Sequence, residues 1–274
     1  MALFTVDEDL CKKDGSCVRV CPVKIVVQKE KGALPEPSDD AEELCIECGH
    51  CVAVCPTAAL SHRAMDPADC EEIEKDRRIA PEEAEQFLKS RRSIRLYKDG
   101  KLSEELIEKL IDTARYAPSG HNSQPVHWTV VYDLEDLKKL GEYVVEWMKG
   151  KLETDPENAK AVNMDRVVAG WVFGIDAIFR GAPHLIITHA PADNMMAPAA
   201  CTIAITYLEL AAHAHGVGSC WGGFFTRAAI EHDPLKKELA LPEGHMVFGA
   251  LMVGKPAVRY KRVPLREPAR TTWR

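Results

Sequence analysis

The residues that most clearly predict chemistry in this sequence are two runs of cysteine near the N-terminus. In the second run, Cys45, Cys48, Cys51 and Cys55 are separated by two, two and three residues, and Pro56 follows directly. With this spacing, one short loop presents three thiolates to one iron–sulfur cube and a fourth to a neighbouring cube. The run therefore predicts that this part of the chain carries electrons.

The first run repeats this frame with one thiolate replaced. Cys11, Cys17 and Cys21 keep the frame, and Asp14 stands where the second cysteine would fall. A carboxylate is a harder ligand than a thiolate and holds iron in a sulfide cage less firmly. Three interpretations are open: a [4Fe-4S] cluster with an aspartate ligand, a [3Fe-4S] cluster with that corner empty, or a domain with one cluster in which Asp14 is a turn residue before Gly15.

Zinc sites and disulfides are the other common uses of closely spaced cysteines. Zinc sites also contain cysteine pairs, but their four ligands come as two separated pairs. A disulfide framework needs an oxidising compartment, and residues 1–8 have neither the basic start nor the apolar core of a signal peptide. We therefore expect reduced thiols and a cytoplasmic protein.

Charge and hydropathy exclude two classes of partner. The 274 residues have a formal net charge of −7, and residues 1–62 contain 11 acidic and 6 basic side chains. This acidic excess argues against a nucleic acid partner, because phosphate binding needs a basic face. The longest apolar stretch, residues 195–217, contains Glu209, His213 and His215, so it predicts a buried helix and no membrane span.

The sequence predicts two domains and a connector. Residues 1–62 form the iron–sulfur domain, and residues 63–80 lack sustained periodicity, as a linker does. Pro81 then begins a helix, because proline suits the first helical position and Glu82 and Glu83 follow it where acids suit the helix dipole. Residues 81–274 are the second domain.

Two clusters in the second domain point to a phosphorylated cofactor. Three arginines and a serine lie within residues 91–95, and guanidinium groups bind phosphate through two parallel hydrogen bonds. A solvated basic helix end is the alternative interpretation of this cluster alone. In the proline- and glycine-containing loop at 117–125, Asn122 and Gln124 supply amides that donate and accept together, as the mixed edge of a flavin ring requires.

Residues 1–62 resemble bacterial two-cluster ferredoxins, including residues 48–60. In that family the fourth cysteine of each run ligates the other cluster. The resemblance therefore implies two ligand sets. These sets are Cys11, Asp14, Cys17 and Cys55 for one cluster, and Cys21, Cys45, Cys48 and Cys51 for the other.

Residues 85–268 resemble the FMN-dependent nitroreductase family. The matching segments, in the family's order, are residues 91–95, 118–125, 180–183, a long helix at 198–215, 216–224 and 254–256. The resemblance implies an α+β fold with a central sheet and surrounding helices, and a homodimer that builds its FMN pockets from both subunits. The implied FMN-binding residues are Arg91, Arg92, Ser93, Arg95, Pro118, Ser119, Asn122, Gln124, Cys220, Trp221, Gly222 and Gly223, with Arg262 or Lys261 from the C-terminal tail.

The resemblance also implies roles for some of these residues. The arginine cluster and the tail residue hold the phosphate and pyrimidine side of FMN, and an N–H of Gly222 or Gly223 lies at flavin N5. Glycine allows the close backbone approach that this contact requires. Trp171 and Phe173 are either stacking residues for the acceptor or core residues. We assign no catalytic role to the Cys220 thiol, because no motif supplies a base for it and a buried thiol in a strand is usually inert.

These features predict a cytoplasmic oxidoreductase. Electrons pass through the iron–sulfur clusters to FMN, and a hydride passes to a small acceptor such as a nitroaromatic compound, a quinone or an activated alkene. The alternatives are an electron-transfer module that donates to a partner protein, and a flavin- or halide-processing enzyme. The donor is a ferredoxin or NAD(P)H; no Gly-x-Gly-x-x-Gly fingerprint is present, but direct stacking of NAD(P)H on FMN needs none.

Overall fold

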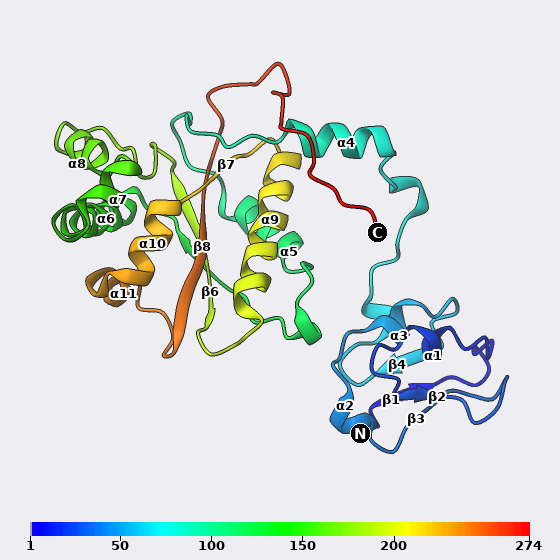
Figure 1. Cartoon of the computed structure of the whole chain (residues 1–274). Coiled ribbons are helices and arrows are strands. Elements are labelled where there is room, and N and C mark those ends of the chain that lie inside the picture. Colours follow the sequence, from blue (N-terminus) through cyan, green and yellow to red (C-terminus); the bar gives the residue numbers. More distant parts are fainter. Residues whose placement is uncertain (1) are drawn as a thin grey trace. The chain divides into compact units, whose positions relative to one another are not determined.

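The computed structural model describes residues 2–274 and divides the chain into two compact units (Figure 1). The first unit contains Met1–Arg78 and His121–Ser123, and the second contains Ile79–Gly120 and Gln124–Arg274. The division predicted from the sequence, at residues 62 and 80, stays a prediction. In the structure, residues 63–78 group with the first unit.

The first unit is a small fold of short strands and helices. Strand β1 (Phe4–Val6) pairs with β4 (Leu60–His62), and β2 (Val26–Val27) pairs with β3 (Glu36–Pro37), both antiparallel. The helical segments are α1 (Ser16–Val20), α2 (Ala41–Leu44), α3 (His50–Ala53), η1 (Pro67–Asp69) and η2 (Lys75–Arg77). A buried apolar cluster holds these elements together, and two of the cysteines, Cys17 and Cys21, are part of it.

The two cysteine runs have the same backbone conformation, repeated at an interval of 34 residues. Gly15 and Gly49 have φ angles of 70° and 71° and are the N-caps of α1 and α3. Left-handed residues recur at the same interval on either side of these glycines. The left-handed set is Lys13, Gly15 and Lys24 in the first run and Glu47, Gly49 and Ala58 in the second. The two runs can therefore be compared residue by residue, because positions 34 residues apart have the same backbone conformation.

The second unit contains a four-stranded antiparallel sheet in the order β5-β6-β8-β7. These strands are β5 (His127–Val131), β6 (His184–Pro191), β8 (His245–Gly254) and β7 (Gly218–Trp221). Strands β6 and β8 are buried along nearly their whole length. Helices cover both faces of the sheet, so the central strands contain continuous apolar runs instead of alternating ones.

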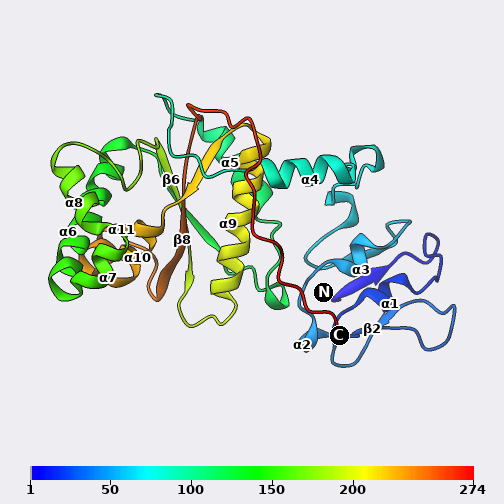
Figure 2. The same ribbon diagram turned by 45° about the horizontal axis from the view of Figure 1, so that its top comes forward.

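Successive residues of β6 divide between the two helical layers, because side chains alternate across a strand. Leu185 and Ile187 pack with helical residues from 134–172 and 223–231, whereas Ile186 packs with helical residues from 104–114 and 197–214. Figures 1 and 2 show these two layers on opposite sides of the sheet (Figure 2). The helices are α4 (Pro81–Ser90), α5 (Glu104–Ala114), α6 (Leu134–Thr154), α7 (Pro156–Ala161), α8 (Met164–Val172), α9 (Ala197–Ala214), α10 (Gly223–Glu231) and α11 (Asp233–Leu239).

This architecture confirms the predicted α+β fold, with its central sheet and surrounding helices. Helix α4 begins at Pro81 as predicted, and the apolar stretch forms helix α9, which is buried on one side and exposed on the other. Among residues 2–274, no helix has both the length and the apolar character that crossing a bilayer demands.

Candidate functional site

The first unit contains a cavity between the start of the first cysteine run and the end of the second. We call it the first cysteine cavity; it is lined by Cys11, Asp14, Cys17 and Cys55, among other residues. Backbone N–H groups already point at two of its sulfurs: Lys13 donates to Cys11 Sγ at 3.4 Å, and Ala59 donates to Cys55 Sγ at 3.2 Å. The four residues of the first predicted ligand set therefore line one cavity.

The conformation of Asp14 is compatible with a role as a turn residue and with a role as a cluster ligand. Its Oδ1 accepts the N–H of Ser16 at 2.7 Å, which is the bond that a turn residue makes. This bond, together with the Ser16 hydroxyl and the nearby Arg19 guanidinium, lowers the pKa of the Asp14 carboxyl. The carboxylate is therefore ionised at neutral pH and lines the cavity, as a ligand must.

The second cysteine cavity is lined by Cys21, Cys45, Cys48 and Cys51, together with residues that include Glu47 and His62. Burial raises the pKa of the Cys51 thiol to about 11, so this thiol keeps its proton at neutral pH unless a metal replaces it. Among residues 2–274, no three Cys, His, Asp or Glu side chains converge on a single ion site. The thiols of each set surround a cavity instead, which suits a cluster whose separate iron atoms each take one ligand.

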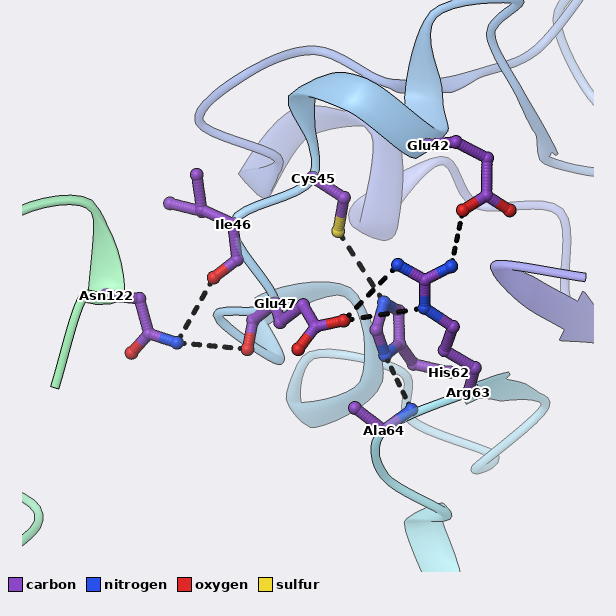
Figure 3. Close-up of polar contacts among 8 residues, drawn as sticks. All are labelled: Glu42, Cys45, Ile46, Glu47, His62, Arg63, Ala64 and Asn122. Carbon is purple, nitrogen blue, oxygen red and sulfur yellow. Dashed lines mark hydrogen bonds and ion pairs between the residues drawn. The ribbon is translucent and has the colours of Figure 1, made fainter.

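Figure 3 shows the polar contacts around Cys45 in this cavity. His62 Nε2 lies 3.5 Å from Cys45 Sγ, and its Nδ1 accepts the N–H of Ala64 at 3.0 Å. The Arg63 guanidinium donates to the carboxylates of Glu42 and Glu47. The sequence alone did not identify His62, because its role depends on a strand pairing that only the fold reveals.

Asn122, from the loop at residues 117–125, groups with the first unit and contacts the loop that carries the second cysteine run. Its side-chain amide donates to the backbone carbonyls of Ile46 and Glu47, at 3.2 Å and 3.1 Å. The structure thus places this predicted flavin contact against the residues between Cys45 and Cys48. The preceding Ser119 Oγ accepts the N–H of Gln124 at 2.9 Å.

The second unit contains a cavity of about 580 Å³, which we call the basic cavity. Its wall includes residues 90–92 and 94, the end of α9, the start of β7 and the segment that follows β8, whereas the predicted Ser93 does not line it. Its charged and aromatic lining residues are Arg91, Arg92, Lys98, His213, Lys255, Arg259 and Tyr260. Five cationic side chains therefore surround one cavity, which is the arrangement expected around an anionic group.

Backbone pairing holds the arginine segment against the sheet. Ile94 donates its N–H to Ser219 O at 2.8 Å, and Lys98 donates to Lys255 O at 2.8 Å. Gly218 makes the first contact possible, because a Cβ at this position would lie 2.9 Å from Ile94 Cγ2. A glycine in β7 therefore fixes the position of the predicted phosphate clamp.

Arg91 and Arg92 each have a protein partner in this cavity. Arg91 Nη1 lies 2.9 Å from Glu209 Oε1, and the Glu209 side chain is only 9% exposed. The Arg92 guanidinium lies 5.7 Å from the centre of the Tyr260 ring, within the range of a cation–π contact. These partners could not be predicted from the sequence, because Glu209 and Tyr260 lie far from the arginine cluster along the chain.

Some predicted flavin contacts lie away from the basic cavity. Lys261 and Arg262 do not line it, whereas Arg259 does. The exposed Arg95 does not line it either, and the same holds for residues 118–119 and 220–223. The tail after β8 has no regular structure, so periodicity could not rank its basic residues.

The two glycines predicted at flavin N5 differ in hydrogen bonding. Gly222 donates its N–H to Ala250 O at 2.9 Å. Gly223 is the first residue of α10, a position whose N–H has no partner within the helix, and a Cβ there would meet no atom within 4 Å. The neighbouring Cys220 thiol is buried, and burial raises its pKa, which agrees with our decision to give it no nucleophilic role.

Trp171 and Phe173 also differ. Trp171 packs on the core cluster of the second unit and lies over Gly141, where a Cβ would be 2.4 Å from its ring. Phe173 is 82% exposed. Trp171 therefore packs against the core and also lines a cavity beside Phe179, whereas Phe173 is mostly exposed.

Comparison with known proteins assigns both parts of the chain. Residues 88–255 match the nitroreductase family, and residues 4–56 match the 4Fe-4S dicluster domain. A protein of Archaeoglobus fulgidus, provisionally named NADH dehydrogenase/NAD(P)H nitroreductase, is 32% identical over 175 residues, which are 64% of this chain and 86% of that protein.

Two solved structures share the fold of the second unit. A nitroreductase of Bacteroides fragilis with bound FMN has a TM-score of 0.58 and 22% identity, covering 70% of this chain and 99% of its own. A nitroreductase of Desulfitobacterium hafniense with bound FMN has a TM-score of 0.56 and 23% identity, covering 69% of this chain and 96% of its own.

Proposed function

Because the chain belongs to the nitroreductase family and also contains a 4Fe-4S dicluster domain, we propose that it is an iron–sulfur flavoprotein. Its family makes it a nitroreductase-type oxidoreductase. In our proposal, electrons enter through two iron–sulfur clusters, pass to FMN and leave by hydride transfer to a small nitroaromatic, quinone or activated alkene acceptor. The protein supplies binding, orientation and electrostatics for this chemistry.

The division of the thiols between two cavities is the observation that carries the electron-entry part of the proposal. Cys11, Cys17 and Cys55 would bind the first cluster, with Asp14 as a fourth ligand or beside an empty corner. The second cluster would take four thiolates. A thiolate from each run crosses to the other set, so neither run forms its cluster site alone.

The basic cavity supports FMN as the second cofactor. Arg92, Lys255 and Arg259 line it, and none of the three forms an ion pair with a carboxylate among residues 2–274, so we assign them to the phosphate. Arg91 would bind through whatever donors its ion pair with Glu209 leaves free. When bound, FMN would supply hydride transfer from its N5 atom.

Gly223 is our choice for the N–H at flavin N5. Its N–H has no acceptor among residues 2–274, whereas the N–H of Gly222 is used by the sheet. An unpaired donor at the start of a helix also favours negative charge nearby. We expect a homodimer to complete this part of the site, as the family resemblance implies, with reduced ferredoxin or NAD(P)H as donor.

Protein purified without oxygen tests this proposal directly. We expect absorbance from both flavin and clusters, one FMN per chain, and iron and sulfide in amounts that fit two clusters. The isolated protein should then reduce a quinone or a nitroarene when it is given reduced ferredoxin or NAD(P)H. Flavin without iron, or iron without flavin, would contradict the proposal, and loaded protein that reduces only a partner protein would favour the electron-transfer module.

A further inference from the structure

His62 is fixed beside the second cysteine cavity by the fold of the first unit. It is the last residue of β4, pairs with Phe4 of β1 and forms a bridge with Met65. Only 7% of its surface is exposed. Next to it, Arg63 bridges Glu42 and Glu47, which lie on either side of Cys45 in the sequence. Backbone pairing with β1 and Met65 therefore holds the His62 imidazole near the Cys45 thiol.

The hydrogen bonds of the ring determine which nitrogen carries the proton. Nδ1 accepts the N–H of Ala64 at 3.0 Å, so in the neutral ring the hydrogen is on Nε2. Nε2 lies 3.5 Å from Cys45 Sγ, within hydrogen-bonding distance for sulfur. His62 is thus an N–H donor to the thiol, and Figure 3 shows this Ala64–His62–Cys45 chain.

The first cysteine run has no equivalent donor. The repeat interval of 34 residues places Gln28 at the position that corresponds to His62. The Gln28 side chain donates to the carbonyl oxygen of Ala33 at 2.7 Å, not to sulfur. The corresponding thiol, Cys11, accepts only the backbone N–H of Lys13 within the described residues.

We propose that His62 is a positioning residue that raises the reduction potential of the second cluster through an N–H···S bond to Cys45. The inference rests on the proposed function, because it takes Cys45 as a cluster ligand. A reduced cluster carries one more electron than the oxidised cluster, so its sulfurs are better hydrogen-bond acceptors. A donor therefore stabilises the reduced form more than the oxidised form, and hydrogen bonds to the sulfurs are a recognised control on cluster potentials.

The test uses the full-length protein with both clusters loaded under anaerobic conditions. We would measure the midpoint potential of each cluster by EPR-monitored titration in the parent protein and in His62→Leu, His62→Gln and Gln28→Leu. Leucine removes the donor and fills similar space, whereas glutamine can donate again. We expect a negative shift for one cluster in His62→Leu, at least partial recovery in His62→Gln, and no shift of that cluster in Gln28→Leu.

A second measurement needs no variant and covers the case in which His62→Leu does not retain its cluster. Parent protein with 15N-labelled histidine should show a weak nitrogen coupling to one reduced cluster in pulsed EPR. Intact clusters with an unmoved potential in His62→Leu, or no histidine coupling in the parent protein, would overturn the inference alone. A parent protein without a second cluster would instead contradict the proposed function.

Discussion

The two halves of the iron–sulfur unit share one backbone pattern but differ in the side chains around their cavities. Asp14 and Cys48 occupy equivalent positions, as do Gln28 and His62. The first cavity therefore has a hard carboxylate and backbone N–H donors, and the second has a fourth thiolate and an imidazole donor. Ligand hardness and hydrogen bonding therefore distinguish the two proposed clusters, whereas the course of the backbone is the same around both.

Removing a thiolate from the second cavity should have the largest effect. Cys48→Ala leaves three ligands, so we expect loss of the second cluster and of turnover driven by reduced ferredoxin, while FMN stays bound and is still reduced chemically. Iron content, EPR and turnover with each donor check this expectation. Cys70→Ala, which removes an exposed thiol from the same unit, is the matched control. Full ferredoxin-driven rates in folded Cys48→Ala would remove the second cluster from the electron path.

Loss of an FMN contact in the basic cavity should leave the clusters in both cysteine cavities unchanged. A charge-assisted hydrogen bond is worth about 1.5–3 kcal/mol, so Arg92→Ala should weaken FMN binding roughly tenfold or more while both EPR signals stay unchanged. Flavin retention after gel filtration and the dissociation constant of FMN measure this effect. The control is Arg115→Ala, which changes an exposed arginine on another surface. Equal retention in Arg92→Ala and the parent would show that the phosphate lies elsewhere.

Arg91 needs a different design, because its guanidinium pairs with a nearly buried carboxylate. Arg91→Ala alone leaves Glu209 without its partner, and an unpaired buried charge destabilises the fold. The double variant Arg91→Ala/Glu209→Gln removes both charges. We expect it to be more stable to denaturant than Arg91→Ala and still to bind FMN less tightly than the parent. FMN affinity equal to that of the parent would exclude Arg91 from the phosphate site.

Asp14→Cys would make the two ligand sets alike, and its effect should be intermediate. The unchanged backbone at the equivalent position already accommodates Cys48, so the variant should keep two [4Fe-4S] clusters in air longer than the parent. EPR and iron content followed over time measure this lifetime. Asp14→Asn separates the interpretations, because asparagine preserves the acceptor for the Ser16 N–H but is a weaker iron ligand. An unchanged signal in both variants would make Asp14 a turn residue only.

The smallest effects should come from the two N-cap glycines. Gly15 and Gly49 both have φ near +70°, where an alanine side chain costs about 1–2 kcal/mol. The nearest atoms to an added Cβ are the flexible ends of Gln28 and Met65, which can move aside. Gly15→Ala and Gly49→Ala should therefore lower the denaturant midpoint, followed by cluster absorbance, by similar amounts. A shift in only one variant would show that the halves differ in their backbone requirements.

The fold class was predicted from the resemblance to the nitroreductase family, whereas single helices were predicted from local signals. Pro81 with two following acids predicted the start of a helix, and the apolar residues around Glu209 predicted a buried one. The cysteine spacing, read through the ferredoxin resemblance, predicted the residues that line each cavity. Each of these inferences depends on neighbours within a few turns of chain or on a repeated pattern.

The remaining features depend on contacts between distant segments. His62 reaches Cys45 only because β4 pairs with β1, and the choice between Gly222 and Gly223 depends on a hydrogen bond to Ala250. Arg259 rather than Arg262 lines the basic cavity, and periodicity could not distinguish them because the tail after β8 has no regular structure. The spacing of residues along the sequence does not predict these contacts between distant segments.

The basic cavity also has a consequence for the kinetics of cofactor capture. It gathers five cationic side chains in a chain whose formal net charge is −7. A positive concavity in an acidic protein attracts phosphorylated molecules over several ångströms and repels cations, so it speeds the encounter before any contact forms. At 0.1 M salt, this attraction is largely screened beyond a distance of about 10 Å. Association of FMN with the empty protein should therefore slow as ionic strength rises, whereas riboflavin, which lacks the phosphate, should associate at a nearly constant rate.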